Sequence, residues 1–231
     1  MQTSDLVLVR GLADTRTTLG AWNERPGPVV ARWTAAALAI ALALLGAVWV
    51  VAGASKPDVS QSFLGFFAHP DVGHVAHVLM RNGLVLALHG FACIAGFIAG
   101  SSMPQEAERY SGVWRRIHDT AGPLAIAFVI AATTFSLVTQ AYVLGQTAAT
   151  LAWHLELTPG LLLLGLLPHA LPELVALFLP LAAWMLASRN DDWHELLAAT
   201  IVTVLLAIPV LIAAAFVEVY VSPGLLRALA G

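Results

Sequence analysis

The residues best suited to chemistry lie in one apolar stretch toward the C-terminus. The segment LLPHALPELVALFLPLAAW, residues 166–184, contains His169 and Glu173, which are four residues apart. On a continuous helix this spacing places both side chains on one face, where a protonated histidine and a carboxylate form a charge-assisted pair. An ionisable group inside a bilayer costs about 2.5–3.5 kcal/mol on insertion scales, so it turns inward and finds a partner. We therefore expect this pair to be buried.

Other polar residues fall at the same depth of the predicted bundle. Asn82 enters the second apolar run, Gln140 lies late in the third and Glu218 ends the fifth. The sequence thus predicts one polar cluster at the outer side of the membrane, made by His169, Glu173 and Glu218 with Asn82 or Gln140. Two neighbouring glutamates would share a proton. We favour a structural role for this cluster; the alternative is a gated path through it.

The elements that position these residues are membrane helices. Hydrophobic residues make up 59% of the chain and charged residues 11%, and the mean hydropathy is +0.82, so too few charges exist for a soluble protein's surface. We predict an all-α integral membrane bundle of about five helices, with a cytoplasmic, amphipathic N-terminal segment at 1–32 and one transmembrane domain at 33–231. The five apolar runs long enough to cross a bilayer are 33–52, 77–100, 123–145, 171–187 and 196–219.

The segment 151–167, LAWHLELTPGLLLLGLL, is harder to place. A histidine, a glutamate and a proline interrupt it, and its apolar part is too short to span. We expect a re-entrant or interfacial helix before the fourth span, and a sixth crossing is the alternative. The fourth span is expected to begin near Pro172, with His169 in the turn above it, because proline suits the first turn of a helix.

Arginines alternate between the predicted loops. Four lie before the first span, three lie in the loop 101–122 and one follows the fourth span, whereas the intervening loops are poorer in Lys and Arg. This alternation predicts that the N-terminus and the loop 101–122 are cytoplasmic. The same loop mixes charges with aromatic residues, as expected of an amphipathic surface helix or of a docking site for an intracellular partner.

Metal and cofactor chemistry has little support in the sequence. His74 and His77 form an H-x-x-H pair, but a metal site needs a third ligand, for which His69 and Glu156 are the candidates. We expect no metal and no cofactor. The single cysteine, Cys93, excludes an internal disulfide, and no hydrolase, zincin or phosphate-loop motif is present, so we expect no enzyme. The net charge of -3 and the lack of a basic stripe argue against nucleic acid.

Small residues on the second predicted span raise the question of assembly. Gly90, Gly96 and Gly100 allow close backbone approach at helical spacing. This pattern predicts dimerisation through that face, and packing within the bundle is the alternative.

Four segments together resemble the stage II sporulation protein M family. The segment containing His169 and Glu173 is similar to the family's proline-histidine-glycine and glutamate signature, and RNGLVLALHGFACIAGFIAG, QAYVLG and AAAFVEVYVSP follow the family's order. Two positions depart from it: Ala170 stands in place of a glycine, and Gln140-Ala141 in place of asparagine-glycine. The resemblance implies motif roles for Asn82, Gly145, Pro168, His169, Glu173, Glu218 and Pro223.

The resemblance implies a multi-pass component of a bacterial or archaeal cell membrane. Family members in spore formers are associated with peptidoglycan-degrading partners, and some relatives accompany ATP-binding-cassette proteins. Our first hypothesis is a non-enzymatic membrane subunit or scaffold in a cell-envelope complex, with extracytoplasmic peptidoglycan hydrolases as partners. The second is the transport subunit of an exporter, with a cytoplasmic ATPase on the loop 101–122. The third is an intramembrane hydrolase or ion carrier that uses His169, Glu173 and Glu218.

Overall fold

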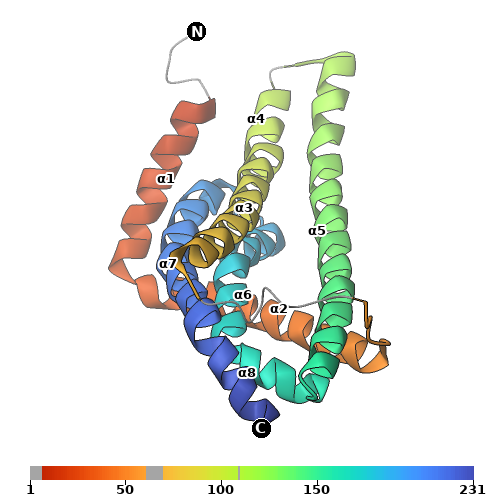
Figure 1. Cartoon of the computed structure of the whole chain (residues 1–231). Helices are drawn as coiled ribbons and strands as arrows, with labels where there is room; N and C mark the ends of the chain where they lie inside the picture. The colour runs from red at the N-terminus through yellow and green to blue at the C-terminus, as the bar shows by residue number, and fades with distance from the viewer. Residues whose placement is uncertain (1–6, 61–69, 109) are drawn as a thin grey trace.

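The computed structural model describes residues 7–60, 70–108 and 110–231, and in these residues it contains helices and turns but no strand (Figure 1). The 3-10 turn η3, Trp193–Glu195, precedes α7, and two π-helical turns, η2 (Ile98–Ser102) and η4 (Val217–Val221), continue α3 and α7. The α-helices are α1 (Val7–Glu24), α2 (Pro26–Ala54), α3 (Val72–Phe97), α4 (Met103–Ala107), α5 (Gly112–His154), α6 (Pro159–Asn190), α7 (Leu196–Phe216) and α8 (Ser222–Ala230).

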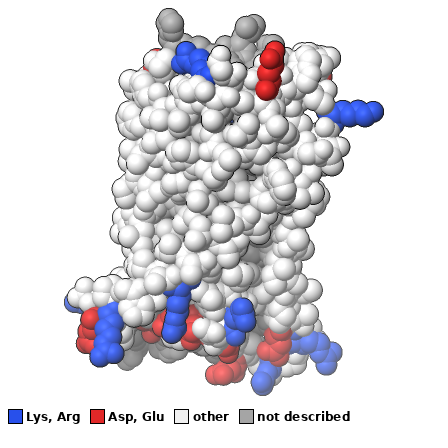
Figure 2. Space-filling view, turned by 90° about the horizontal axis from the view of Figure 1, so that it is seen from below, with Lys and Arg blue, Asp and Glu red and all other residues white. Residues whose placement is uncertain are grey.

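Five helical stretches are long and apolar enough to cross a membrane, which confirms the predicted all-α membrane bundle. They are Pro26–Ala54, Val72–Ser101, Gly112–His154, Pro159–Asn190 and Trp193–Ala230. Figure 2 shows charged side chains at the two ends of this face of the molecule, with an uncharged band between them. Such a band is what the hydrocarbon core of a bilayer requires.

Helix α6 lies at the centre of the bundle. It packs against α2, α3, α7 and α8, and all nine residues from Ala176 to Trp184 are buried. A helix that is apolar on every side, as this stretch is, belongs in an interior. Phe178 fills much of the core, with only 1% of its surface exposed.

Two side chains of α3 bond backbone carbonyls of α6 on either side of its interior turn at Pro180. Pro180 has no N–H to donate to the carbonyl of Ala176, four residues earlier. Nearby, the carbonyl of Leu177 accepts a hydrogen bond from Nδ1 of His89 at 2.7 Å, and Cys93 Sγ donates to the carbonyl of Pro180 at 3.1 Å. Because His89 and Cys93 are four residues apart on α3, one face of α3 contacts the backbone of α6 around Pro180.

Helix α5 differs from α6 in its surroundings. It packs mainly on α2 and stands apart from α3 over much of its length (Figure 1). Phe128 and Phe135 are 73% and 74% exposed. Gly145 marks the close contact with α2, since a Cβ there would collide with Val51 and approach the carbonyl oxygen of Val48.

The structure differs from our expectation for the segment 151–167. Its first residues end α5 at His154, and its remainder begins α6, which runs without a break from Pro159 to Asn190. Pro159 starts the helix because its missing N–H would have no partner in the first turn, and Thr158 caps it by accepting from the N–H of Leu161 at 3.3 Å. The segment is therefore no separate re-entrant element, and the fourth span does not begin at Pro172.

Two helices meet within the predicted N-terminal segment 1–32. Helix α1 stops at Glu24 and α2 begins at Pro26, so 26–32 belong to the first membrane-capable helix. Helix α1 packs against α7 and η3, and its own Thr15 and Thr18 are buried.

The glycine face of α3 packs inside the chain. A Cβ at Gly96 would collide with the indole of Trp184, one at Gly100 with Trp193, and one at Gly90 would lie 3.7 Å from Thr200. Residues of α6, η3 and α7 thus cover these three glycines, which favours the alternative of packing within the bundle, and dimerisation stays a prediction.

Candidate functional site

Three helical elements bring polar groups together near the C-terminal end of the bundle. Glu173 of α6 interacts electrostatically with Glu218 in η4 and with Arg81 and Asn82 of α3. Arg81 also acts on the Glu218 carboxylate. The structure thus places Glu173, Glu218 and Asn82 in one cluster, as the sequence predicts, and adds the guanidinium of Arg81. We call these four residues the carboxylate cluster.

The carboxylate cluster leaves two buried polar atoms unsatisfied. Asn82 is 3% exposed, and its side chain approaches the Glu173 carboxylate. Within the described part of the chain, however, neither Asn82 Nδ2 nor Glu173 Oε2 completes a hydrogen bond of normal geometry. One is a donor and the other an acceptor, so a small shift of the Asn82 amide or a bridging water would satisfy both.

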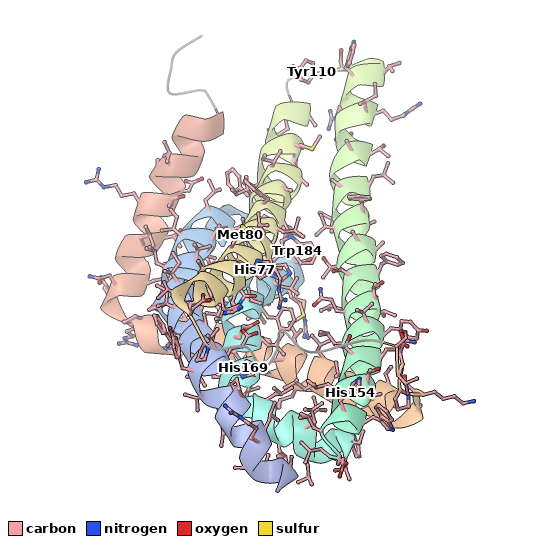
Figure 3. The ribbon with its side chains drawn as sticks, in the orientation of Figure 1. His77, Met80, Tyr110, His154, His169 and Trp184 are labelled. Carbon is pink, nitrogen blue, oxygen red and sulfur yellow. The ribbon has the colours of Figure 1, made fainter. Side chains whose placement is uncertain are left out.

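His169 has a different partner from the one its spacing predicts. Its Nδ1 lies 2.7 Å from Oγ of Ser222, whose hydroxyl also lies 3.2 Å from the carbonyl of Val217. Figure 3 labels His169 on α6. Which of the two groups donates in the His169–Ser222 bond depends on the tautomer of His169. His169 is 8% exposed and Ser222 is fully buried. The chain His169–Ser222–Val217 therefore ties α6 to the junction of η4 and α8.

The sequence around Ser222 explains the π-helical turn η4 that precedes it. Pro223 lies in the first turn of α8 and cannot donate to a preceding carbonyl. The π-helical turn η4 inserts one extra residue before it, which shifts the register of the residues that follow. That shift brings the Ser222 hydroxyl to the carbonyl five residues earlier and presents its oxygen to His169.

Gln140 does not join the cluster. Its Nε2 donates to Ser136 Oγ at 3.0 Å in its own helix, and with His89 it lines a groove of about 300 Å³ between α3 and α5. The other residues of the family motif lie outside the cluster. Gly145 allows close contact with α2, Pro168 is exposed within α6, and Pro223 lies in the first turn of α8.

The histidine pair at the start of α3 is not part of a three-ligand metal site among the described residues. His74 is occupied with Asp71: its N–H donates to Oδ1 at 3.0 Å, and Nδ1 lies 3.4 Å from Oδ2. That backbone hydrogen bond is the main cause that lowers the pKa of Asp71 below its usual value. Among the described residues no three potential ligands converge on a metal position. His69 lies outside the described residues.

Sequence reasoning missed Arg81 and Ser222. Arg81 directly precedes Asn82, and it counted there only as a loop charge; the signal was a cation one residue from a predicted site residue. Ser222 follows Glu218 by four residues, which places the two on one helix face, but only the π-helical turn and Pro223 make the hydroxyl reach His169.

The site combines one buried hydrogen-bonded chain with one group of ionisable side chains. Burial of Ser222 keeps its hydroxyl away from solvent, and Nδ1 of His169 faces this hydroxyl inside the bundle. The arrangement can fix α6, η4 and α8 relative to one another, and the carboxylates can hold a proton or the Arg81 charge.

Comparison with known proteins gives one match. A family model described as Stage II sporulation protein M matches residues 35–223. A search of curated proteins and a search of solved structures each returned no match. The matched range includes both parts of the site and covers most of the chain, which belongs to the stage II sporulation protein M family.

Proposed function

We propose that the protein is a non-enzymatic membrane subunit that acts as a scaffold in a cell-envelope complex of the peptidoglycan-remodelling type. The observation that carries this proposal is that the motif residues contact one another, or neighbouring residues of the same chain, inside the bundle. His169 reaches Ser222 inside the bundle, and Glu173 faces Glu218, Arg81 and Asn82. A catalytic serine must be reached by substrate, whereas Ser222 has no exposed surface. We therefore infer that the motif residues hold the C-terminal segment in place.

The membrane face of α5 supports work in a complex. Apolar side chains on this helix stay open, among them Phe128, Phe135 and Val138, while the other spans bury a larger share of their surface. Lipid covers such a face in a lone subunit, and neighbouring proteins have access to it in an assembly.

The proposed partners can be tested by copurification. The tagged chain is extracted from its native membranes in mild detergent after crosslinking, and the bound proteins are identified by mass spectrometry. A double variant, His169→Ala with Glu173→Ala, serves as the comparison, because it loosens the C-terminal segment. We expect peptidoglycan hydrolases to copurify with the natural chain and to be reduced with the variant. A chain that copurifies with no envelope protein contradicts the proposal.

An exporter subunit would give a different result in the same experiment. Its cytoplasmic ATPase would copurify, and the chain would stimulate ATP hydrolysis by that protein. Such stimulation, lost when Arg115 and Arg116 at the start of α5 are replaced by alanine, would overturn the scaffold proposal in favour of transport.

The proposed orientation places the N-terminus in the cytoplasm. The positive-inside rule favours this side, because arginines are more numerous at the end of the bundle that carries α1, α4 and η3. Those with described side chains are Arg16, Arg25, Arg32, Arg115, Arg116 and Arg189 at that end, against Lys56, Arg81 and Arg227 toward the other.

Cysteine labelling of intact cells tests the orientation. In a Cys93→Ala background, Ser60→Cys and Ser111→Cys place single thiols at exposed positions before α3 and before α5. We expect a membrane-impermeant maleimide to label the first and not the second. Labelling of Ser111→Cys alone would reverse the orientation.

A further inference from the structure

A second polar region lies at the opposite end of the bundle from the carboxylate cluster. Helices α1, α2 and α6 and the turn η3 enclose a cavity of about 290 Å³ there. Figure 1 shows α1 beside α7 and the start of α2 at this end. Trp22 and Trp33 line the cavity together with Arg32, Asp192 and Glu195. Tryptophan and arginine are typical of the headgroup level of a membrane, which is where this end of the five spans lies.

The described charged side chains that line this cavity do not pair with one another. Within the described residues, no ion pair or hydrogen bond joins Arg32 to Asp192 or Glu195, although all three line one cavity. The carboxylates of Asp192 and Glu195 are close enough to repel each other. Arg32 of α2 therefore brings a cation to the lining of the cavity, and Asp192 and Glu195, before and in η3, bring two anions. A ligand that carries a negative and a positive group at short separation fits this distribution.

The cavity opens toward an apolar groove. A second hollow, of about 190 Å³, shares Trp22, Val29 and Trp33 with the first and continues along Val30 and Val202. The two indoles meet edge to face at 5.1 Å between ring centroids, so they form a rigid border between the charged and the apolar part. A ligand that fills both parts is amphipathic.

We propose that this cavity binds an ethanolamine phospholipid. The phosphate lies against the Arg32 guanidinium, the primary ammonium lies against Asp192 and Glu195, and one acyl chain follows the groove past Val30 and Val202. Arginine suits phosphate because its donors form a fork, and an ammonium donates to two carboxylates at once. A choline headgroup has no N–H to donate, and a glycerol headgroup brings no positive charge to the carboxylates. A soluble zwitterion leaves the apolar groove empty.

Native mass spectrometry of the purified full chain tests the proposal. The chain in detergent is titrated with phosphatidylethanolamine, phosphatidylcholine and phosphatidylglycerol of identical acyl chains, and with soluble phosphoethanolamine. We expect phosphatidylethanolamine to bind about tenfold more tightly than the other two lipids, the size of one charge-assisted hydrogen bond. Phosphoethanolamine alone should not compete at equal concentration. Equal affinity for the three lipids, or full competition by phosphoethanolamine, would overturn the proposal.

Two sets of variants locate the site. Arg32→Gln should weaken binding of all three lipids about tenfold, whereas Arg25→Gln, at the start of α2 and outside the cavity, should bind as the natural chain does. Asp192→Asn with Glu195→Gln should remove the preference for ethanolamine over choline and keep the shared phosphate affinity. Unchanged binding in Arg32→Gln, or a retained ethanolamine preference in the double variant, counts against this site. Thermal unfolding of each variant separates lost binding from lost folding.

Discussion

Helices α5 and α6 are both long and apolar, yet one is the periphery of the molecule and the other its centre. Phe178 of α6 is 1% exposed and Phe135 of α5 is 74% exposed. Helix α6 carries Pro180, His169 and Glu173, and each of these lies against another helix or the C-terminal segment. On α5 several hydroxyls donate to carbonyls of the same helix, as in the 2.8 Å bond from Thr134 to the carbonyl of Ile130. Polar residues that reach other helices therefore mark the central helix, since the mean hydropathy of α5 and α6 is similar.

Phenylalanine truncation should separate the two helices most strongly. Phe178→Ala removes a ring from the core and is expected to lower the free energy of unfolding by about 3–5 kcal/mol. Phe135→Ala removes the same ring from the exposed face of α5, and we expect a change within about 0.5 kcal/mol. Unfolding of both variants in the same detergent measures the difference. Similar losses in the two variants would mean that α5 is packed as tightly as α6.

The contact of α5 with α2 should be sensitive at one position. Gly145→Leu places a side chain against Val51 and the Val48 carbonyl, so we expect a loss of about 2–3 kcal/mol in the free energy of unfolding. Gly46→Leu is the matched control, because a Cβ at Gly46 meets nothing within 4 Å. If Gly145→Leu unfolds with the natural midpoint, α5 is not held where the structure places it.

Loss of the hydrogen bond between His89 of α3 and the Leu177 carbonyl of α6 should lower the free energy of unfolding by a smaller amount. His89→Leu leaves the Leu177 carbonyl without its donor and should cost about 1–2 kcal/mol. His77→Leu, at an exposed position on the same helix, should leave stability unchanged. Thermal unfolding of the two variants under the same conditions compares these losses. If His89→Leu and His77→Leu lose the same stability, the Leu177 carbonyl needs no donor from α3.

The sequence predicts the spans well because their length and hydropathy are local properties. It also brings Asn82, Glu173 and Glu218 into one cluster, since the cost of a buried charge acts wherever the helices meet. The start of α6 was misplaced because Pro159 and Pro172 are both acceptable helix starts, and only packing selects the first. Gln140 was misplaced because α5 leans on α2, which is a tertiary choice. Ser222 reaches His169 through a π-helical turn that periodicity does not reveal.

The partner of the glycine face could not be read from spacing either. Gly96 permits close approach by any helix, and the indole of Trp184, far along the chain, occupies the space. Small residues thus predict that something packs tightly and leave open what does so.

The central claim is that the family motif braces the C-terminal segment against α6. A double-mutant cycle of His169→Phe and Ser222→Ala, measured by unfolding in detergent, tests this claim most directly. Because the two side chains meet at 2.7 Å in the interior, we predict a coupling energy of about 1 kcal/mol. Single-variant losses that add to within about 0.3 kcal/mol of the double variant would show that the two residues do not brace each other, and would contradict the account.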